Sequence, residues 1–172
     1  METPQVLRCY GGADWFAGDR VSQRARIAGW VNAASATLGV MANVREIMTA
    51  DPLTLEPEMT VLKALEMMNQ VWIRHLPVCK DGKVVGMLSD RDLRNFEMQD
   101  WVSAVSTEKV REYLAMPVST MMSTEVKAVG PNATTSDAAS MILSAEISAL
   151  PVVDDGKIVG IVTTDDLLRT LV

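Results

Sequence analysis

The stretch His75-Leu76-Pro77-Val78 recurs as Ala149-Leu150-Pro151-Val152, 74 positions further along the chain. The same offset relates Asp81-Gly82-Lys83 to Asp155-Gly156-Lys157. Shorter matches at this offset are Ile47-Met48-Thr49 with Met121-Met122-Ser123, Pro57 with Pro131, Thr60 with Thr134, Val85-Gly86 with Val159-Gly160, and Asp92-Leu93 with Asp166-Leu167. Because the offset is constant, the sequence contains two copies of one unit without an insertion. We place the first copy at 44–98 and the second at 118–172.

Each copy predicts the same order of elements: strand, helix, strand, strand, helix. A short extended piece comes first, at 52–55 and 126–129, and a helix follows it. Thr60 and Thr134 are suitable N-caps for these helices, and apolar residues recur behind them at helical spacing. Two strands then flank an Asp-Gly turn, as in a β-hairpin, and a last helix begins at Asp90 or Thr164. A unit of about 55 residues buries its apolar face poorly alone, so the copies should pack against each other.

The composition and net charge are those expected of an ordinary soluble globular domain. The 172 residues are 48% hydrophobic and 22% charged, and a net charge of −6 gives no general attraction to nucleic acid. No apolar run approaches the roughly 20 residues that span a bilayer. The start, Met1-Glu2-Thr3-Pro4, lacks the order of a signal peptide, so we expect a cytoplasmic protein. Cys9 and Cys79 form no CxxC pair, which indicates neither a disulfide framework nor a metal site.

The repeated residues resemble the cystathionine-β-synthase-type (CBS) domain. In the first copy the likeness is carried by Met48-Thr49, Pro57, Thr60, Leu76-Pro77-Val78, Asp81-Gly82, Gly86 and Ser89-x-x-Asp92-Leu93. In the second copy it is carried by the stretch from Ile147 to Asp154, by Val159-Gly160-Ile161-Val162 and by Thr163-x-x-Asp166-Leu167. The resemblance implies an α/β (α+β) fold of two β-α-β-β-α repeats. These repeats would pack with pseudo-two-fold symmetry into one Bateman module.

A hydroxyl three residues before a carboxylate is the most informative spacing, and it occurs as Ser89-x-x-Asp92 and Thr163-x-x-Asp166. One interpretation is a capping box, in which the hydroxyl caps the last helix and the acid reaches back to the backbone. The other is a ligand site. Helix N-termini attract phosphate, and an ionised carboxylate accepts hydrogen bonds from two donors. The resemblance implies that Asp92 and Asp166 hold a ribose and that Ser89 and Thr163 lie by the phosphate.

The two copies differ where a phosphate would lie. Arg91 precedes the acid in the first copy, whereas Asp165 precedes it in the second. Arginine favours a phosphorylated ligand, and aspartate would repel one. We therefore expect two unequal sites, with AMP, ADP or ATP on the Arg91 side.

Upstream of the Leu-Pro-Val strand the same contrast appears. Arg74-His75 in the first copy corresponds to Ser148-Ala149 in the second, and the resemblance places these positions beside the nucleotide. Arg74 would meet phosphate across the cleft between the copies. His75, the only histidine of the chain, is either a ligand residue or a partly buried residue at a helix end. By the same resemblance, Leu53 and Lys127 would line the base.

The resemblance implies an adenine-nucleotide sensor that signals to an unidentified regulated protein, and a homodimer. S-adenosylmethionine and NAD are alternative ligands, and a ligand-free interaction or dimerisation module is an alternative function. One histidine and two distant cysteines supply no nucleophile–base–orienter set, so we expect no catalytic residues and no enzyme. No membrane partner is expected, and nucleic acid is disfavoured.

Two segments lie outside the copies. The linker 99–117 contains a short charged helix at 107–114. The extension 1–43 has four arginines against three acidic residues, a charge of about +1 that leaves −7 on the rest. Three interpretations of this extension stay open: a flexible leader, a helix docked on its own module, or an interaction arm.

Overall fold

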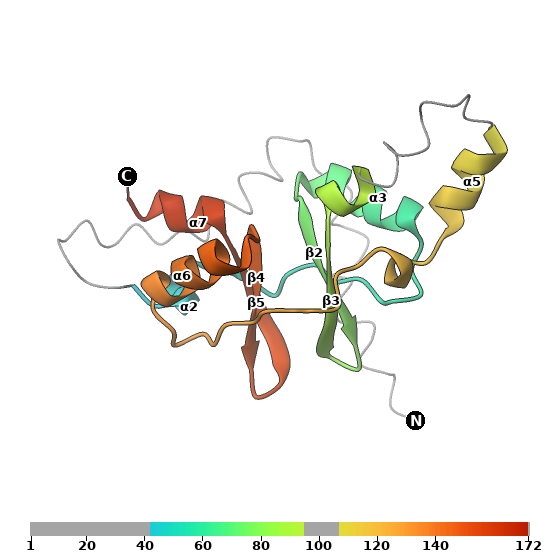
Figure 1. The fold of residues 1–172 in the computed structure, drawn as a ribbon. Coiled ribbons are helices and arrows are strands. Elements are labelled where there is room, and N and C mark those ends of the chain that lie inside the picture. Colours follow the sequence, from blue (N-terminus) through green and yellow to red (C-terminus); the bar gives the residue numbers. More distant parts are fainter. Residues whose placement is uncertain (1–41, 95–106, 172) are drawn as a thin grey trace. The chain divides into compact units, whose positions relative to one another are not determined.

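The computed structural model describes residues 42–94 and 107–171. The predictions for residues 1–41 and for the first part of the linker concern residues outside these ranges. Within them the chain forms a mixed helix and strand fold, drawn in Figure 1. None of the described helices combines the length and the apolar character that crossing a membrane requires.

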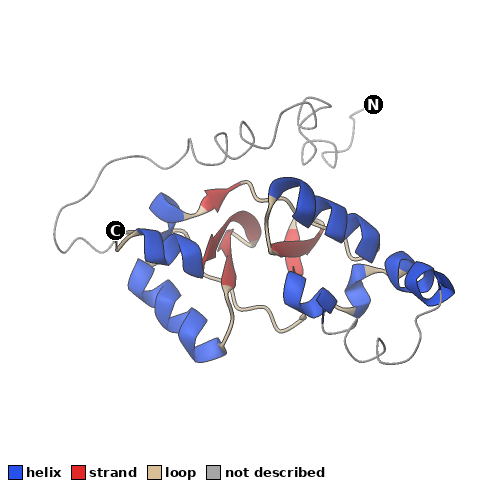
Figure 2. Cartoon of the chain, turned by 90° about the horizontal axis from the view of Figure 1, so that it is seen from above, coloured by secondary structure: helices blue, strands red, loops and turns tan. Residues whose placement is uncertain are grey.

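The two copies have matching elements. In the first copy these are α3 (Val61–Val71), β2 (His75–Lys80), β3 (Lys83–Ser89) and a helical turn at 90–94. In the second copy they are α6 (Thr135–Ala145), β4 (Ala149–Asp154), β5 (Lys157–Thr163) and α7 (Thr164–Arg169). The linker helix is α5 (Thr107–Ala115). Figure 2 shows helices on the outside of the strands in both copies, which confirms the α+β class.

Both predicted helix starts are confirmed. The Thr60 hydroxyl accepts a hydrogen bond from the amide of Lys63 at 3.3 Å, and the Thr134 hydroxyl accepts one from Asp137 at 3.1 Å. Asp137 returns the contact to Thr134 and completes a capping box. Both helices are thus capped at their N-terminal ends. From there their apolar faces pack against the hairpins.

Both hairpins are confirmed as well. β2 pairs antiparallel with β3, and β4 with β5. Asp81 and Gly82 have φ angles of 52° and 77°, and Asp155 and Gly156 have φ angles of 48° and 77°. A two-residue turn with positive φ at both central positions matches the twist of the strands it joins, so the Asp-Gly pair determines this connection.

The extended pieces before the helices are shorter as strands than predicted. Leu55 makes a single parallel bridge to Val78, and Val129 makes one to Val152. Leu55 receives a hydrogen bond from the Cys79 amide at 2.8 Å and donates one to Pro77 at 2.9 Å. Pro77 has no amide to continue the ladder, which limits the pairing on this edge.

The first residues of each copy pack on the other copy. β1 (Thr49–Ala50) pairs with β5, where Thr49 faces Ile161, and Ser123 correspondingly bridges Met87. The short helices α2 (Val44–Ile47) and η3 (Val118–Thr120) likewise pack on the opposite copy. We call residues 44–50 and 118–123 the exchanged segments. Their amides donate in pairs that obey the 74-residue offset: Val44 to Ala133 and Val118 to Met59, Arg45 to Pro131 and Ser119 to Pro57. The two copies are therefore interlocked.

The interior consists of two apolar clusters, one behind each hairpin. The first contains Leu76, Val78 and Leu88 together with Val118 from the opposite copy. The second contains Leu150, Val152 and Val162 together with Val44. All eight of these side chains are fully buried. Each core is thus completed by the exchanged segment, which agrees with the expectation that one copy alone buries too little surface.

Candidate functional site

The first hydroxyl–acid pair lies where β3 ends and the helical turn at 90–94 begins. Oδ2 of Asp92 accepts hydrogen bonds from the Ser89 amide at 2.7 Å and from the Ser89 hydroxyl at 2.6 Å. The Ser89 hydroxyl in turn accepts one from the Asp92 amide at 3.3 Å. This is the reciprocal geometry of a capping box.

The second pair repeats this geometry where β5 meets α7. Oδ2 of Asp166 accepts from the Thr163 amide at 2.9 Å and from the Thr163 hydroxyl at 2.6 Å, and Thr163 accepts from the Asp166 amide at 3.3 Å. The capping interpretation of the sequence is thus confirmed in both copies.

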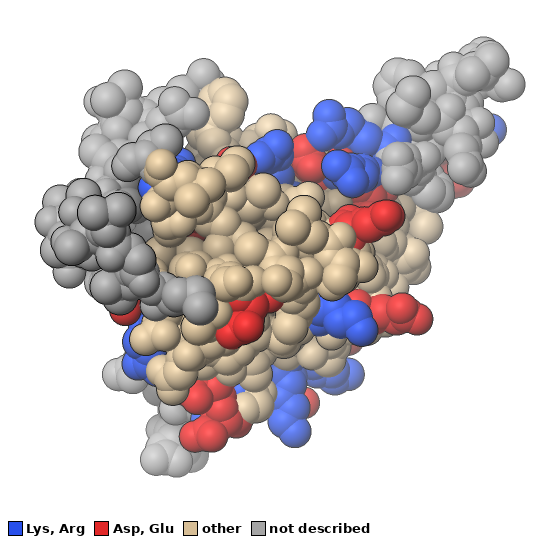
Figure 3. Space-filling model, turned by 60° about the vertical axis from the view of Figure 1, so that its left-hand side comes forward, with Lys and Arg blue, Asp and Glu red and all other residues tan. Residues whose placement is uncertain are grey.

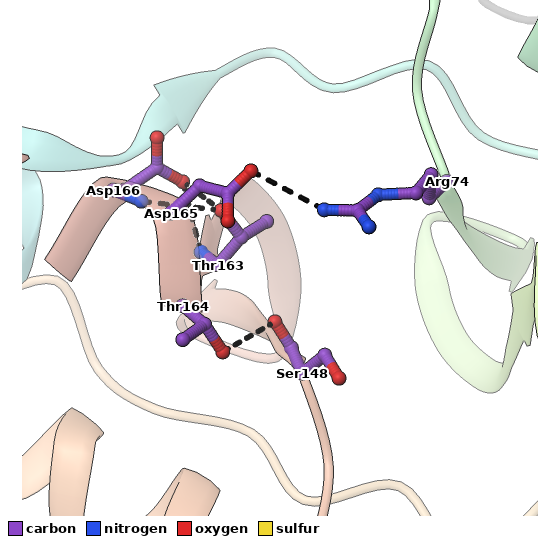
Figure 4. A network of polar contacts seen from close by, with 6 residues as sticks. All are labelled: Arg74, Ser148, Thr163, Thr164, Asp165 and Asp166. Carbon is purple, nitrogen blue, oxygen red and sulfur yellow. Dashed lines mark hydrogen bonds and ion pairs between the residues drawn. The ribbon is translucent and has the colours of Figure 1, made fainter. Parts of the chain in front are cut away.

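Capping uses only one oxygen of each carboxylate. In the described part of the chain, Oδ1 of Asp92 and Oδ1 of Asp166 have no hydrogen-bond partner. Figure 4 shows the second oxygen of Asp166 pointing away from Thr163. Both side chains are half-buried. Since an ionised carboxylate has about four acceptor positions, each acid can cap its helix and accept from a ligand's hydroxyl groups at once.

Strand pairing brings further predicted residues beside these acids. His75 lies opposite Ser89 in the first hairpin, and Ala149 lies opposite Thr163 in the second. Burial lowers the pKa of His75 below its ordinary value of 6.5; the carboxylates of Asp90 and Asp92 oppose this shift, and Arg74 adds to it. The histidine is therefore held toward its neutral form, in which it both donates and accepts a hydrogen bond.

Arg74 lies against the opposite copy. Its Nη2 is 3.3 Å from Oδ2 of Asp165, in the first turn of α7. Its own carbonyl accepts from the Asp90 amide at 2.9 Å, just as Ser148 accepts from Thr164 at 3.0 Å. Arg91 is exposed and joins no ion pair within the described ranges. The two arginines predicted to meet phosphate thus have different surroundings.

The two residues predicted for the base have different settings. Leu53 is partly buried and packs against the first core. Lys127 is exposed. Within 42–94 and 107–171, no hydrogen bond or ion pair joins Lys127 to Asp92 or Asp166. The described ranges also hold no group of three His, Cys, Asp or Glu side chains that could bind a metal ion.

A pair of contacts beside the strands was missed by sequence reasoning. A Cβ placed on Gly86 would lie 2.8 Å from Cγ of Met122, and one on Gly160 would lie 3.0 Å from Cγ of Met48. Each methionine comes from the exchanged segment of the other copy. The constant offset of the Met and Gly positions was the available signal, but an offset alone does not say that they touch.

Comparison with known proteins identifies the repeat. A family model of the CBS domain matches residues 44–98 and 118–172. The CBS domain-containing protein YhcV of Bacillus subtilis (strain 168) is 34% identical over 127 residues, which cover 74% of this chain and 84% of that protein.

Solved structures share the fold. The structure of CBSX2 in complex with AMP is 28% identical, with a TM-score of 0.62 over 75% of this chain and 95% of that one. The CBS domain pair of protein MJ0100, solved with 5′-methylthioadenosine and S-adenosyl-L-methionine, has a TM-score of 0.66 at 24% identity. It covers 77% of this chain and 97% of that one.

Proposed function

Because the chain belongs to the CBS domain family and carries the domain twice, we propose that it is a regulatory module for an adenine nucleotide, AMP, ADP or ATP. The ligand would bind where the ends of the two copies meet, and its unequal affinity for two arrangements of the copies would signal to a partner protein. The observation that carries the proposal is the second oxygen of Asp92 and of Asp166, which capping leaves available.

The chemistry of the site suits a nucleoside. Oδ1 of each acid would accept from ribose hydroxyls, and Ser89, Thr163 and the neighbouring amides would lie by the 5′ end. AMP is bound in the structure of the related CBSX2, which supports an adenosine ligand here. Leu53 remains our choice for a side chain against the base in the first copy, and Lys127 in the second.

A homodimer is the assembly we propose for this module. Leu143 on α6 is 77% exposed, and Leu168 and Leu171 at the C-terminal end of the chain are 56% and 77% exposed. Figure 3, turned so that the side bearing α6 and α7 comes forward, shows a broad area without charged side chains. Exposed leucines favour contact with a second apolar surface, and a second copy of the chain supplies one.

A thermal-shift panel of the full chain tests the proposed function. Adenosine, AMP, ADP, ATP, S-adenosylmethionine and NAD are each added over a concentration series. A nucleotide at about 100 times its Kd adds about 2.7 kcal/mol to the free energy of unfolding, so the melting temperature should rise with AMP, ADP or ATP. A rise of the melting temperature with S-adenosylmethionine or NAD alone would show that this compound is the ligand in place of AMP, ADP or ATP. If nothing in the panel raises it, the sensor proposal fails and the ligand-free interaction module takes its place.

A further inference from the structure

The ion pair between Arg74 and Asp165 joins residues 91 positions apart, one from each copy. Arg74 precedes β2, and Asp165 stands directly before Asp166 in α7. Figure 4 shows the guanidinium and the carboxylate pointing toward one another beside the Thr163–Asp166 pair. The side chains are 63% and 60% exposed, so a solute can reach both.

The repeat gives this ion pair no counterpart in the other half of the module. At the 74-residue offset, Arg74 corresponds to Ser148 and Asp165 corresponds to Arg91. Serine and arginine form no ion pair, so the arrangement is one-sided. On the second copy's side, a cation that could meet an anionic ligand already has a carboxylate beside it.

We infer that Asp165 is a specificity-determining residue, which competes with a ligand's phosphate for Arg74 and so sets how strongly phosphate charge is preferred in the second copy. This inference rests on the proposed function. A phosphate that binds Arg74 must displace the carboxylate of Asp165, and it then also lies close to that negative charge. Neither effect opposes the binding of an adenosine compound without phosphate. Asp165 therefore biases the second copy toward ligands of low negative charge.

The size of the effect follows from exposure. Exposed ion pairs contribute about 0.2–1 kcal/mol, so releasing Arg74 should change phosphate affinity by about 1.4- to fivefold. The change should shrink with added salt, because the Debye length falls from about 10 Å at 0.1 M to about 3 Å at 1 M.

Calorimetric titration of AMP, ATP and adenosine into full-length variants tests the inference. Every variant carries Asp92→Ala, so that only the second copy is titrated. Asp165→Asn should tighten the binding of AMP and ATP by about 1.4- to fivefold at low salt and leave that of adenosine unchanged. Arg74→Gln should weaken AMP and ATP and reduce the gain that Asp165→Asn gives.

Asp154→Asn is the matched control, because it removes the same charge and breaks the ion pair of Arg45 with Asp154, which is 3.4 Å long. Asp154 lies at the turn end of the hairpin, whereas Ala149 and Thr163 pair at the other end, roughly 17 Å away for five extended residues. An unchanged AMP-to-adenosine ratio in Asp165→Asn overturns the inference, as does an equal gain in the control.

Failure of the proposed function looks different. If wild type binds none of the three compounds, the proposed function falls and the inference falls with it. If wild type binds but the Asp92→Ala background does not, the second copy has no such site. The inference is then overturned while the proposed function stands.

Discussion

In Asp92 and in Asp166 the two carboxylate oxygens have different surroundings. Oδ2 accepts two hydrogen bonds from the residue three positions earlier, and Oδ1 is left to other donors. The two interpretations that the sequence left open are therefore compatible. The Ser-x-x-Asp and Thr-x-x-Asp spacings predicted the cap fully, because a capping box is a local arrangement.

His75 gives the module a pH dependence of stability. Its folded pKa lies below 6.5 because burial disfavours the charged imidazolium, so the unfolded chain binds more protons in the window below 6.5. Stability is full above about pH 6.5 and decreases as the pH falls through that window to the folded pKa. His75→Gln should flatten this part of the curve of melting temperature against pH. Since the chain has one histidine, an equal slope in the variant would contradict the assignment.

Strands β3 and β5 are each crossed by the exchanged segment of the other copy, and each needs a glycine at that point. At Gly86 and at Gly160 an added Cβ would press on a methionine of the other copy. Gly86→Ala and Gly160→Ala should each lower the free energy of unfolding by about 1–3 kcal/mol, as overpacking does. Denaturant titration measures the loss.

Gly130 is the matched control for these substitutions. A Cβ there meets nothing within 4 Å, and Gly130 is not in the left-handed region. Gly130→Ala should change the free energy of unfolding by no more than about 1 kcal/mol. Equal losses at all three glycines would show that the methionine contacts are not the cause.

Local elements were predictable because their signals are local. Thr60, Thr134 and the two Asp-Gly turns identified helix starts and hairpins by the chemistry of a few adjacent residues. The exchange of α2 and η3 was not predicted. A repeat at constant offset is equally consistent with segments that pack on their own copy, and only the contacts across the copies decide between them.

The arrangement of the two copies also explains why part of the site escaped prediction. The family resemblance predicted that Arg74 meets phosphate across the cleft between the copies, and in the structure its neighbour there is Asp165, 91 residues away. No pattern in the chain encodes that distance. The hydroxyl–acid pairs were found because each lies within four residues, whereas charge at the junction depends on how the copies meet.

We expect the proposed homodimer to depend on the exposed leucines of the chain. Leu143→Glu and Leu168→Glu should shift the chain from dimer to monomer. Burying an unpaired charge in an apolar interface costs more free energy than the contact contributes. Sedimentation velocity measures the change. Val110→Glu, which adds the same charge on α5 in the linker, should leave the dimer intact. A dimer that withstands both leucine substitutions would place the interface elsewhere.

The most direct test of the module's function is calorimetric titration of AMP into wild type, Asp166→Asn and Asp137→Asn. Asp137 completes a capping box with Thr134 as Asp166 does with Thr163, so both substitutions remove one cap carboxylate. Of these two acids, Asp166 is assigned to a ribose and Asp137 is not. Asp166→Asn should abolish AMP binding in the second copy while Asp137→Asn binds like wild type. Equal binding by all three proteins would contradict the assignment of the ligand site.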